Sequence, residues 1–592
     1  MEAPLALFRR WRLGLHLCTV AVALVGVLCL NSNRRSLSGT FDESNHLAAG
    51  LEWWQFGSYG MWTENPPLPR LAIAALPYLH GMRLPPRAEW DPRTNKWYRS
   101  WEVGLDMLYA GAGFEQNLAW ARLGILPFFA IALLAVWGLA DGRRRPWAGF
   151  IAVALTSTLP ALIAHGALAT TDVAFVGMFL LATLALLRWF EGASLRRASF
   201  LGAAAGLALL TKFSLLIFFP LTVLAFLVAR WIAKLPARPS NPVGDGPLGW
   251  RSLAGQVALA ALTGVLMTWA GYRFSIGRID SLAPEIWLQI LPPVADRVGL
   301  TGLLLRTTLP MPELFHGLRF LAAHDAAGHD AYLLGKIAEH GFLAFYPVAL
   351  LVKTPLTFLL LLLLCVPILA RRRPALWPAQ AMALAALAIL LVSLHSHVNL
   401  GIRHVFVLLP LLAVAMACAI EQEMADWRGR KRVLAAALVG ALLCAQSGIA
   451  VAAGSKALGY FNALAGSDPA TILLDSDLDW GQDLFALRRE ARVRNIDVLK
   501  IAYFGTLRLC QHGLPRLEGL APGKETTGWI AISENYYRHR NFFMLLKDPC
   551  NPKSPWKESE IPPNAFAWLR KYTPVAIVGS SIRLYHVVGD GQ

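Results

Sequence analysis

A series of apolar segments, each about the length of a helical bilayer crossing, constrains this fold more than any other feature. A transmembrane helix needs about 20 mainly apolar residues. Hydrophobic residues make up 56% of the 592 residues and charged residues only 16%, the composition of an integral membrane protein. Eleven candidate spans lie at about 13–30, 118–140, 147–164, 168–187, 199–211, 213–233, 252–271, 345–369, 377–394, 402–420 and 433–453.

Basic clusters between the spans predict the topology, because Lys and Arg accumulate in cytoplasmic loops. The clusters lie at 9–12, 143–145, 188–197, 234–238, 371–373 and 428–432. A cytoplasmic N-terminus followed by eleven spans places all of them inside, and it leaves three long segments outside, about 31–117, 272–344 and 454–592. The net charge of +17 therefore indicates helix orientation, and we expect no nucleic-acid partner.

The first outer segment has the pattern of surface helices. Leu47, Leu51 and Trp54 continue from an acidic pair with helical spacing, and aromatic residues are frequent around them. Aromatic belts lie at headgroup depth, so we expect a helix along the membrane surface. The turn Glu64-Asn-Pro-Pro-Leu68 ends that helix and begins another over 69–79. The alternative is that this loop only caps the bundle. At the N-terminus, Val27-Leu-Cys-Leu30 is not a small-residue cleavage site, which predicts a retained signal anchor.

The tail after residue 453 has a different pattern. Strands are predicted at 472–474, 498–504 and 528–533, helices at 483–495, 535–547 and 564–572, and a hairpin over 575–587. Alternating strands and helices indicate a small α/β domain. We therefore predict a polytopic α-helical membrane protein, residues 1–453, with a C-terminal extracytoplasmic α/β domain, residues 454–592. Cys510 and Cys550 are the only cysteines of the tail and are predicted to form a disulfide in an oxidising compartment.

The unusual polar residues of the apolar part converge on one predicted face. Ionisable groups in or beside a bilayer are costly and therefore indicate functional sites. On the outer face lie Asp42 and Glu43 after the first span, Glu64 in the loop, His165 and Asp172 between spans three and four, Lys212 between spans five and six, Lys353 in span eight, and Asn399, Arg403 and His404 between spans nine and ten. This convergence predicts a site on that face.

Several of these residues also have purely structural interpretations. Asp172 follows two threonines and could cap a helix. Lys212 could extend to the headgroups, and His165 could be a satisfied buried polar residue. Arg403 is harder to explain in this way, because a guanidinium at a span entry suits a phosphate.

Two metal-binding interpretations are weak. The histidines 395, 397 and 404 lack a firm ligand spacing, and no cysteine accompanies them. The string Asp475-Ser-Asp477-Leu-Asp479 has Trp480 where a calcium loop requires Gly. As the metal–nucleotide motif of sugar-nucleotide transferases it would lie outside the cell, away from its substrate. We therefore assign no metal ligands and no cofactor, keep a divalent metal as an alternative, and interpret the string as a structural loop that faces the site.

The order of these motifs resembles a known superfamily. An Asp-Glu pair, a surface helix, Asn65-Pro-Pro-Leu68, Thr171-Asp172, Gly206-Leu-Ala-Leu-Leu-Thr-Lys212 and Asn399-x-Gly-x-Arg-His404 follow one another. This pattern resembles the GT-C glycosyltransferases of the protein O-mannosyltransferase and lipid A aminoarabinose transferase type. The string from Leu474 to Leu484 resembles a bacterial, phospholipid-carrier-dependent subgroup. The α/β tail departs from the β-trefoil insert of the mannosyltransferases.

The resemblance implies transfer of a hexosyl or pentosyl group from a polyprenyl-phosphate donor to a lipid, glycan or protein acceptor, on the extracytoplasmic side of a bacterial inner membrane. Asp42 and Glu43 are the expected catalytic residues. Arg403, Lys212, Lys353 and His404 are expected to bind the donor phosphate, and Asp172, Glu64, His165 and Asn399 the sugar or acceptor. The alternatives are an oligosaccharide ligase or oligosaccharyltransferase of the same fold, and a lipid-linked sugar transporter or flippase.

Overall fold

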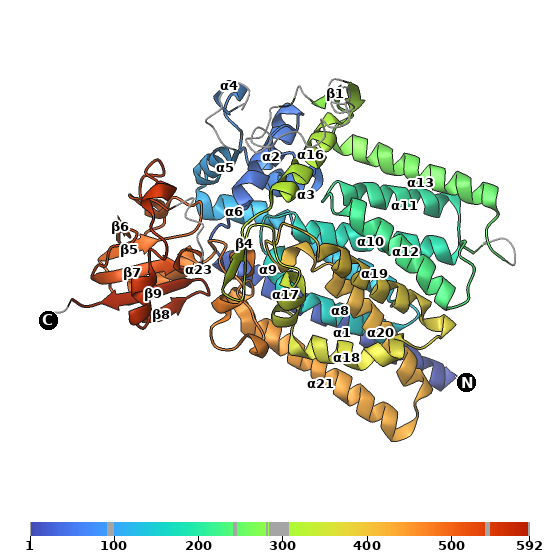
Figure 1. The fold of residues 1–592 in the computed structure, drawn as a ribbon. Helices are drawn as coiled ribbons and strands as arrows, with labels where there is room; N and C mark the ends of the chain where they lie inside the picture. The colour runs from blue at the N-terminus through green and yellow to red at the C-terminus, as the bar shows by residue number, and fades with distance from the viewer. Residues whose placement is uncertain are drawn as a thin grey trace.

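The computed structural model describes residues 2–90, 100–240, 246–279, 282, 307–538 and 545–589. A bundle of long helices forms the larger part, and a mixed sheet lies at one end of it (Figure 1). The bundle contains α1 (Glu2–Ser36), α6 (Phe114–Leu123), α7 (Leu126–Leu139), α8 (Pro146–Ser157), α9 (Pro160–Gly166), α10 (Asp172–Glu191), α11 (Leu195–Leu209), α12 (Leu215–Ile232), α13 (Trp250–Gly271), α17 (Phe345–Lys353), α18 (Leu356–Leu369), α19 (Trp377–Ser393), α20 (Leu408–Asp426) and α21 (Gly429–Ala453).

Every predicted span corresponds to a helix or a bent helix pair in this bundle. Among the described residues, eight helices are long and apolar enough to cross a membrane, or up to ten with the pairs α8–α9 and α17–α18, which bend by 63° and 112°. The remaining predicted span, 199–211, is α11, which has 15 residues. Apolar side chains such as Leu17, Leu262 and Leu363 are exposed on the outer faces of α1, α13 and α18. Exposed apolar surface of this kind fits a lipid environment, and the chain is a polytopic membrane protein.

The predicted cytoplasmic clusters meet one another in space. Arg145 forms an ion pair with Glu421 at the end of α20, and Arg371 pairs with Glu423 at 2.7 Å. Arg12 donates a hydrogen bond to the carbonyl of Arg143. In Figure 1 the N-terminus lies at the end of the bundle away from the sheet. Basic residues from separate loops thus gather at one end, as the alternation of spans requires.

Short helices cover the other end of the bundle. They are α2 (Glu43–Phe56), α3 (Pro67–Leu79), α4 (Arg87–Trp90), α5 (Ser100–Tyr109) and α16 (Pro312–Ala327), with the hairpins β1 (Ile276–Arg278)–β2 (Thr308–Pro310) and β3 (Ala331–Leu333)–β4 (Lys336–Ala338). The helices predicted after the acidic pair and over 69–79 are confirmed as α2 and α3. Proline in the first turn of α3 has a backbone suited to that position.

The tail contains a five-stranded sheet in the order β6-β5-β7-β9-β8. Its strands are β5 (Val498–Ala502), β6 (Arg516–Gly519), β7 (Gly528–Ser533), β8 (Ala576–Val578) and β9 (Ile582–Val587), and β5 is parallel to both β6 and β7. Its helices are α22 (Leu484–Val493) and α23 (Glu534–Arg538). Cys510 and Cys550 form the predicted disulfide, with their Cα atoms 5.3 Å apart.

Three predicted elements of the tail need correction, and one strand was not predicted. The apolar run 472–474 is not a strand; it lies between short 3-10 turns over Pro469–Thr471 and Asp475–Asp477. Strand β6 was not predicted, and the segment 564–572 contains a 3-10 helix, Ala567–Lys571, rather than an α-helix. The predicted helix 535–547 is observed only as α23, and its residues 539–544 lie outside the described residues.

Candidate active site

Four predicted residues form a chain of ion pairs at the end of the bundle next to the tail. Arg403 Nη1 lies 3.1 Å from Asp42 Oδ2 and 3.7 Å from Asp172 Oδ2, and Lys212 Nζ lies 2.8 Å from Asp172 Oδ1. These residues are separated by up to 361 positions in the sequence. Asp172 is 2% exposed, whereas the side chain of Asp42 remains 29% exposed. The chain therefore connects a buried carboxylate to a partly exposed one.

Helix ends position the two carboxylates. Asp42 is the N-cap residue of α2, but its side chain makes no capping hydrogen bond and points to Arg403 instead. Asp172 is the first residue of α10, and it pairs with Lys212 rather than capping the helix. The interpretations of Asp172 as a cap and of Lys212 as extended to the headgroups are therefore wrong, because each side chain has the other as its partner.

Aromatic rings fix the guanidinium of Arg403. Its Cζ lies 4.2 Å from the centroid of the Trp480 ring. His165 stacks on Phe406 at 5.5 Å and lies 6.0 Å from Trp480. A cation over an indole ring is stabilised by the ring quadrupole. His165 is buried, and its Nδ1 has no hydrogen-bond partner among the described residues.

The acidic string of the tail holds the turn that carries Arg403. Asp477 Oδ1 accepts a hydrogen bond from the Ile402 amide at 3.0 Å, and the Ser476 hydroxyl donates to the Leu400 carbonyl. Gly401 has φ +134°, and a Cβ there would collide with Ser476. This turn thus requires glycine. Burial raises the pKa of Asp477 to about 6, although Lys353 acts in the opposite direction.

The same string also holds the segment before Asp42. The Ser38 amide donates to the Gln482 carbonyl at 2.9 Å, and the Ser38 hydroxyl bridges Gly481 and Leu484. Residues 476–484 are therefore bonded to both sides of the Asp42–Arg403 pair, as expected for a structural loop that faces the site. We define residues 476–484 as the clamp segment.

Glu43, adjacent to Asp42, has a different environment. It forms a buried ion pair with Arg122, at 2.7 Å, in which each side chain is 1% exposed. Its carboxylate also accepts hydrogen bonds from the amides of Thr40 and Ala169. Burial alone would raise the pKa of Glu43, but Arg122 outweighs it and the pKa is lowered. Glu43 thus joins α2, α6 and the loop before α10.

Glu64 lies in a network beneath α2. Its Oε1 is 3.5 Å from Arg70 Nη2. Arg70 is fully buried and donates to His46 Nδ1 at 3.1 Å, and His46 lies one helical turn after Asp42. Asn65 accepts a hydrogen bond from Thr171, next to Asp172, at 3.4 Å. Glu64 is therefore linked to the site through other side chains.

The remaining predicted residues lie around the chain of ion pairs. Lys353 is buried at the end of α17 and donates to the carbonyls of Leu458 and Asp477. Asn399 accepts a hydrogen bond from the Phe342 amide at 2.7 Å. His404 follows Arg403 in the 3-10 turn Ile402–His404 and is partly buried. No group of three or more His, Cys, Asp or Glu side chains arranged to hold a metal is found within the described part of the chain.

Comparisons with known proteins give one family match, within the bundle, and several similar structures. Residues 114–237 match the family model of dolichyl-phosphate-mannose-protein mannosyltransferases. The matched segment covers part of the bundle and agrees with the resemblance to the GT-C glycosyltransferases that the sequence motifs indicate. Crystal structures of ArnT from Cupriavidus metallidurans, bound to undecaprenyl phosphate and in the apo state, are similar at 15% and 14% identity, each covering 96% of this chain and 98% of that chain with a TM-score of 0.30. No curated protein matches the sequence.

Sequence reasoning missed the residues that support the predicted ones. Arg122 lies near the outer end of an apolar span, where a charge is costly without a partner, so its position alone could have indicated the pair with Glu43. In the sequence, Trp480 is the residue that breaks a calcium-loop pattern and a member of the string from Leu474 to Leu484, and neither pattern predicts its contact with Arg403. Its contact with Arg403 joins the tail to the bundle over a long sequence separation, which local patterns do not show.

Proposed function

We propose that this protein is a GT-C glycosyltransferase that moves one hexosyl or pentosyl group from a polyprenyl-phosphate donor to a hydroxyl of a lipid, glycan or protein acceptor. The observation that carries this proposal is the chain Asp42–Arg403–Asp172–Lys212, which places two acidic and two basic side chains within ion-pair distance. Sugar transfer from a lipid phosphate needs a proton acceptor for the attacking hydroxyl and cations for the departing phosphate.

The reaction follows from these charges. The acceptor oxygen attacks the anomeric carbon, the bond from that carbon to the phosphate oxygen breaks, and the acceptor proton passes to the Asp42 carboxylate. The partly exposed Asp42 is better placed for this role than Glu43, whose oxygens are engaged by Arg122 and two backbone amides. We assign Glu43 a positioning role at the start of α2.

Arg403 and Lys212 bind the donor phosphate in this proposal. A phosphate would compete with Asp42 and Asp172 for these cations, and a guanidinium suits its oxygens well. His404 lies beside Arg403 and completes this group. Asp172 orients the sugar or the cations, with His165 beside it. Lys353, Asn399 and Glu64 act by holding the surrounding turns, since their polar atoms already contact protein groups.

The proposed location is the extracytoplasmic face of a bacterial inner membrane. The chain of ion pairs contacts the tail through Trp480, whereas Arg145 and Arg371 form ion pairs with the last turns of α20. The sheet of the tail and the N-terminus lie at opposite ends of the bundle (Figure 1). Positively charged loops tend to remain in the cytoplasm, which supports a site on the opposite face.

Release of polyprenyl phosphate by the purified protein in detergent tests the proposal. The wild type should release it from a polyprenyl-phosphate sugar when an acceptor is present. Asp42→Asn should reduce turnover about 10²-fold or more while donor binding persists. Arg403→Ala should weaken donor binding by removing a charge-assisted hydrogen bond.

Two outcomes would favour the alternatives. A transporter gives no polyprenyl phosphate with any donor, because detergent abolishes transport but permits transfer. An oligosaccharide ligase releases the lipid phosphate or diphosphate only from oligosaccharide-carrying lipids and ignores a single-sugar donor.

A further inference from the structure

Two acidic residues fasten the clamp segment to the sheet of the tail. Asp483 Oδ2 accepts hydrogen bonds from the amides of Ser580 and Ser581, at 2.8 and 3.1 Å, and from both of their hydroxyls. Asp479 Oδ2 accepts one from the Asn535 amide at 2.9 Å. Ser580 and Ser581 form the turn between β8 and β9, and Asn535 belongs to α23, which follows β7. The clamp segment is therefore bonded to two separate places on the tail.

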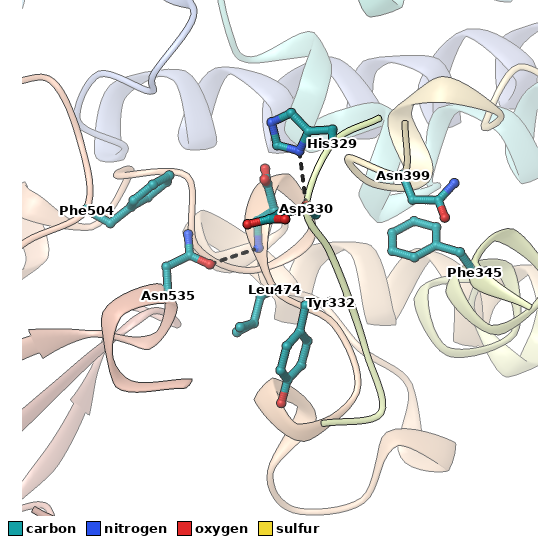
Figure 2. A pocket seen from close by; sticks show the side chains of 9 residues that line it. His329, Asp330, Tyr332, Phe345, Asn399, Leu474, Phe504 and Asn535 are labelled. Atoms are coloured by element: carbon teal, nitrogen blue, oxygen red, sulfur yellow. Dashed lines mark hydrogen bonds between the residues drawn. The ribbon is translucent and has the colours of Figure 1, made fainter. Parts of the chain in front are cut away.

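The junction between the tail and the outer loops is closely packed. The Asn535 side chain accepts a hydrogen bond from the Asp475 amide at 3.3 Å (Figure 2), and it donates to the Asp479 carbonyl at 2.8 Å. The pocket drawn in Figure 2, between the tail and the segment that leads into β3, has room for about one water molecule. The start of the clamp segment thus has little free space in which to shift.

Trp480 is the clamp residue whose side chain contacts Arg403. It is 3% exposed, and the centroid of its ring lies 4.2 Å from Arg403 Cζ and 6.0 Å from that of the His165 ring. Its backbone amide donates to the Gln482 side chain at 2.7 Å, within the same segment. A guanidinium over an indole is attracted by the ring quadrupole, and the attraction is stronger where water is excluded. The tail thus supplies one face of the environment of Arg403.

The other contacts of Arg403 are those that a donor would change. Its Nη1 lies 3.1 Å from Asp42 and 3.7 Å from Asp172, the carboxylates with which a donor phosphate competes in the proposed function. Its Nε is buried and has no hydrogen-bond partner among the described residues. A phosphate that takes the place of these carboxylates leaves the contact with Trp480 intact. The indole can therefore hold the guanidinium in both the free and the donor-bound states.

We propose that the tail is a positioning element of the transferase and that Trp480 is its positioning residue. The indole holds the Arg403 guanidinium in the orientation that receives the donor phosphate, and Asp479 and Asp483 hold the indole in place from the sheet. The proposal rests on the proposed glycosyltransfer and gives the tail a role in donor binding. Trp480 itself touches no reacting group and acts through Arg403.

Binding of a lipid phosphate to the purified full chain in detergent tests this role. The probe is farnesyl phosphate, a short form of the lipid product, so that no sugar transfer is needed for the measurement. Trp480→Leu should weaken its binding about tenfold through loss of the cation–π contact. Trp480→Phe keeps an aromatic face and should weaken it about threefold or less.

A double-mutant cycle separates action through Arg403 from a general effect on the fold. In the Arg403→Ala background, Trp480→Leu should change the affinity by less than about twofold, because no guanidinium remains to be positioned. Lys212 remains in that background, so residual binding is measured at high probe concentration. If Trp480→Leu does not fold, Trp480→Phe makes the same comparison, with a loss expected in the wild-type background and none in Arg403→Ala.

Trp568→Leu is the matched control. Trp568 packs against a separate core cluster of the tail and lies outside the clamp segment, so its loss weakens the tail without removing a contact of Arg403. Both variants are compared below their unfolding temperatures, which are measured in parallel. Trp568→Leu should bind farnesyl phosphate as the wild type does.

Four results would overturn the proposal: no binding of the probe to the wild type, unchanged binding in Trp480→Leu, equal losses in Trp480→Leu and Trp568→Leu, or the same loss from Trp480→Leu with and without Arg403. Failure of the proposed function is distinguishable from these results. If the wild type releases polyprenyl phosphate but Trp480→Leu binds the probe normally, the positioning role alone fails. If the binding cycle is as expected but no donor is ever cleaved, the transfer itself is wrong.

Discussion

Asp42 and Glu43 are adjacent in the sequence, but their different environments in the structure give them different roles. Asp42 is 29% exposed and contacts Arg403, whereas Glu43 is 1% exposed and contacts Arg122. Both belong to the start of α2, so helical geometry directs their side chains to different neighbours. The pair could be recognised from the sequence, but the assignment of both residues to catalysis did not anticipate that the second carboxylate holds three segments together.

Substitution of each carboxylate should therefore have a different effect. Glu43→Ala leaves Arg122 as an uncompensated buried charge, which should cost about 3–5 kcal/mol of stability. Asp42→Asn should leave the thermal stability in detergent nearly unchanged and remove activity. The measurement is thermal unfolding of both variants next to their turnover.

A double substitution separates charge from packing at this pair. In Glu43→Leu/Arg122→Met both charges are replaced by apolar groups, which is often neutral for a buried pair. Part of the stability lost in Glu43→Ala should return, while the amides of Thr40 and Ala169 and the carbonyls that Arg122 contacts lose their partners. If Glu43→Ala is as stable as the wild type, the ion pair does not hold α2 as described.

The raised pKa of Asp477 predicts that the stability of the protein depends on pH. Its pKa is raised by burial from 3.8 to about 6, so the ionised form is disfavoured in the folded state. The protonated carboxyl contributes stability below pH 4 that is lost as the pH rises through 6. Asp477→Asn cannot ionise and keeps an acceptor for the Ile402 amide. The variant should therefore gain stability relative to the wild type between pH 4 and pH 7, as measured by unfolding temperature at both pH values. A difference between variant and wild type that is constant with pH would contradict this interpretation.

At the scale of elements, hydrophobic periodicity and turn-forming residues predicted the helices and strands that depend on local sequence. The helices α2 and α3, strands β5 and β7 and the final hairpin follow from spacing and proline positions. The run Ile472-Leu-Leu474 failed because an apolar triplet is equally suited to a strand and to a buried turn. Leu473 and Leu474 are buried between two 3-10 turns. The clamp segment depends on contacts with residues 38 and 400–402, which no local rule could supply.

The short helix α11 depends on close packing with α13. A Cβ on Gly202 would collide with the Ala260 carbonyl and the Thr263 hydroxyl, and one on Gly206 would lie 2.6 Å from the Gly264 carbonyl. Small residues allow such close approach of membrane helices. Gly202→Leu should therefore destabilise the protein by about 1–3 kcal/mol through overpacking. Gly255→Leu, on a face of α13 with no atom within 4 Å of the new Cβ, is the control. Equal unfolding temperatures for the two variants would show that α11 and α13 do not pack as observed.

At the scale of the whole molecule, two separate groups of ion pairs can be distinguished in the helix bundle. Arg12, in the N-terminal part of α1, contacts the loop that carries Arg143, and Arg145 pairs with Glu421 of α20. Arg403, in the chain from Asp42 to Lys212, instead contacts Trp480 of the tail. Charge distribution in the sequence predicted this division, because loop charge sets helix orientation. The sequence could not predict how the tail docks, since Trp480 and the clamp segment meet the bundle only in three dimensions.

Reporter fusions test the orientation on which the proposed location depends. Fusions in the loops at residues 142 and 372, which carry the basic clusters, should be cytoplasmic. Fusions at residues 112, 335 and 523 should be extracytoplasmic, because each follows an odd number of predicted spans from a cytoplasmic N-terminus.

The helix α11 decides whether the number of crossings is odd or even. With 15 residues it is short for a crossing of about 20 residues. If α11 did not cross, every later loop would change sides, residue 372 would be external and residues 335 and 523 internal. Since residue 112 precedes α11, its reporter would stay external in either case and serves as the control. A cytoplasmic reporter at residue 523 would separate the tail from the face that holds Asp42, which their direct contacts forbid, so such a result would overturn the arrangement of the site as well as the count of spans.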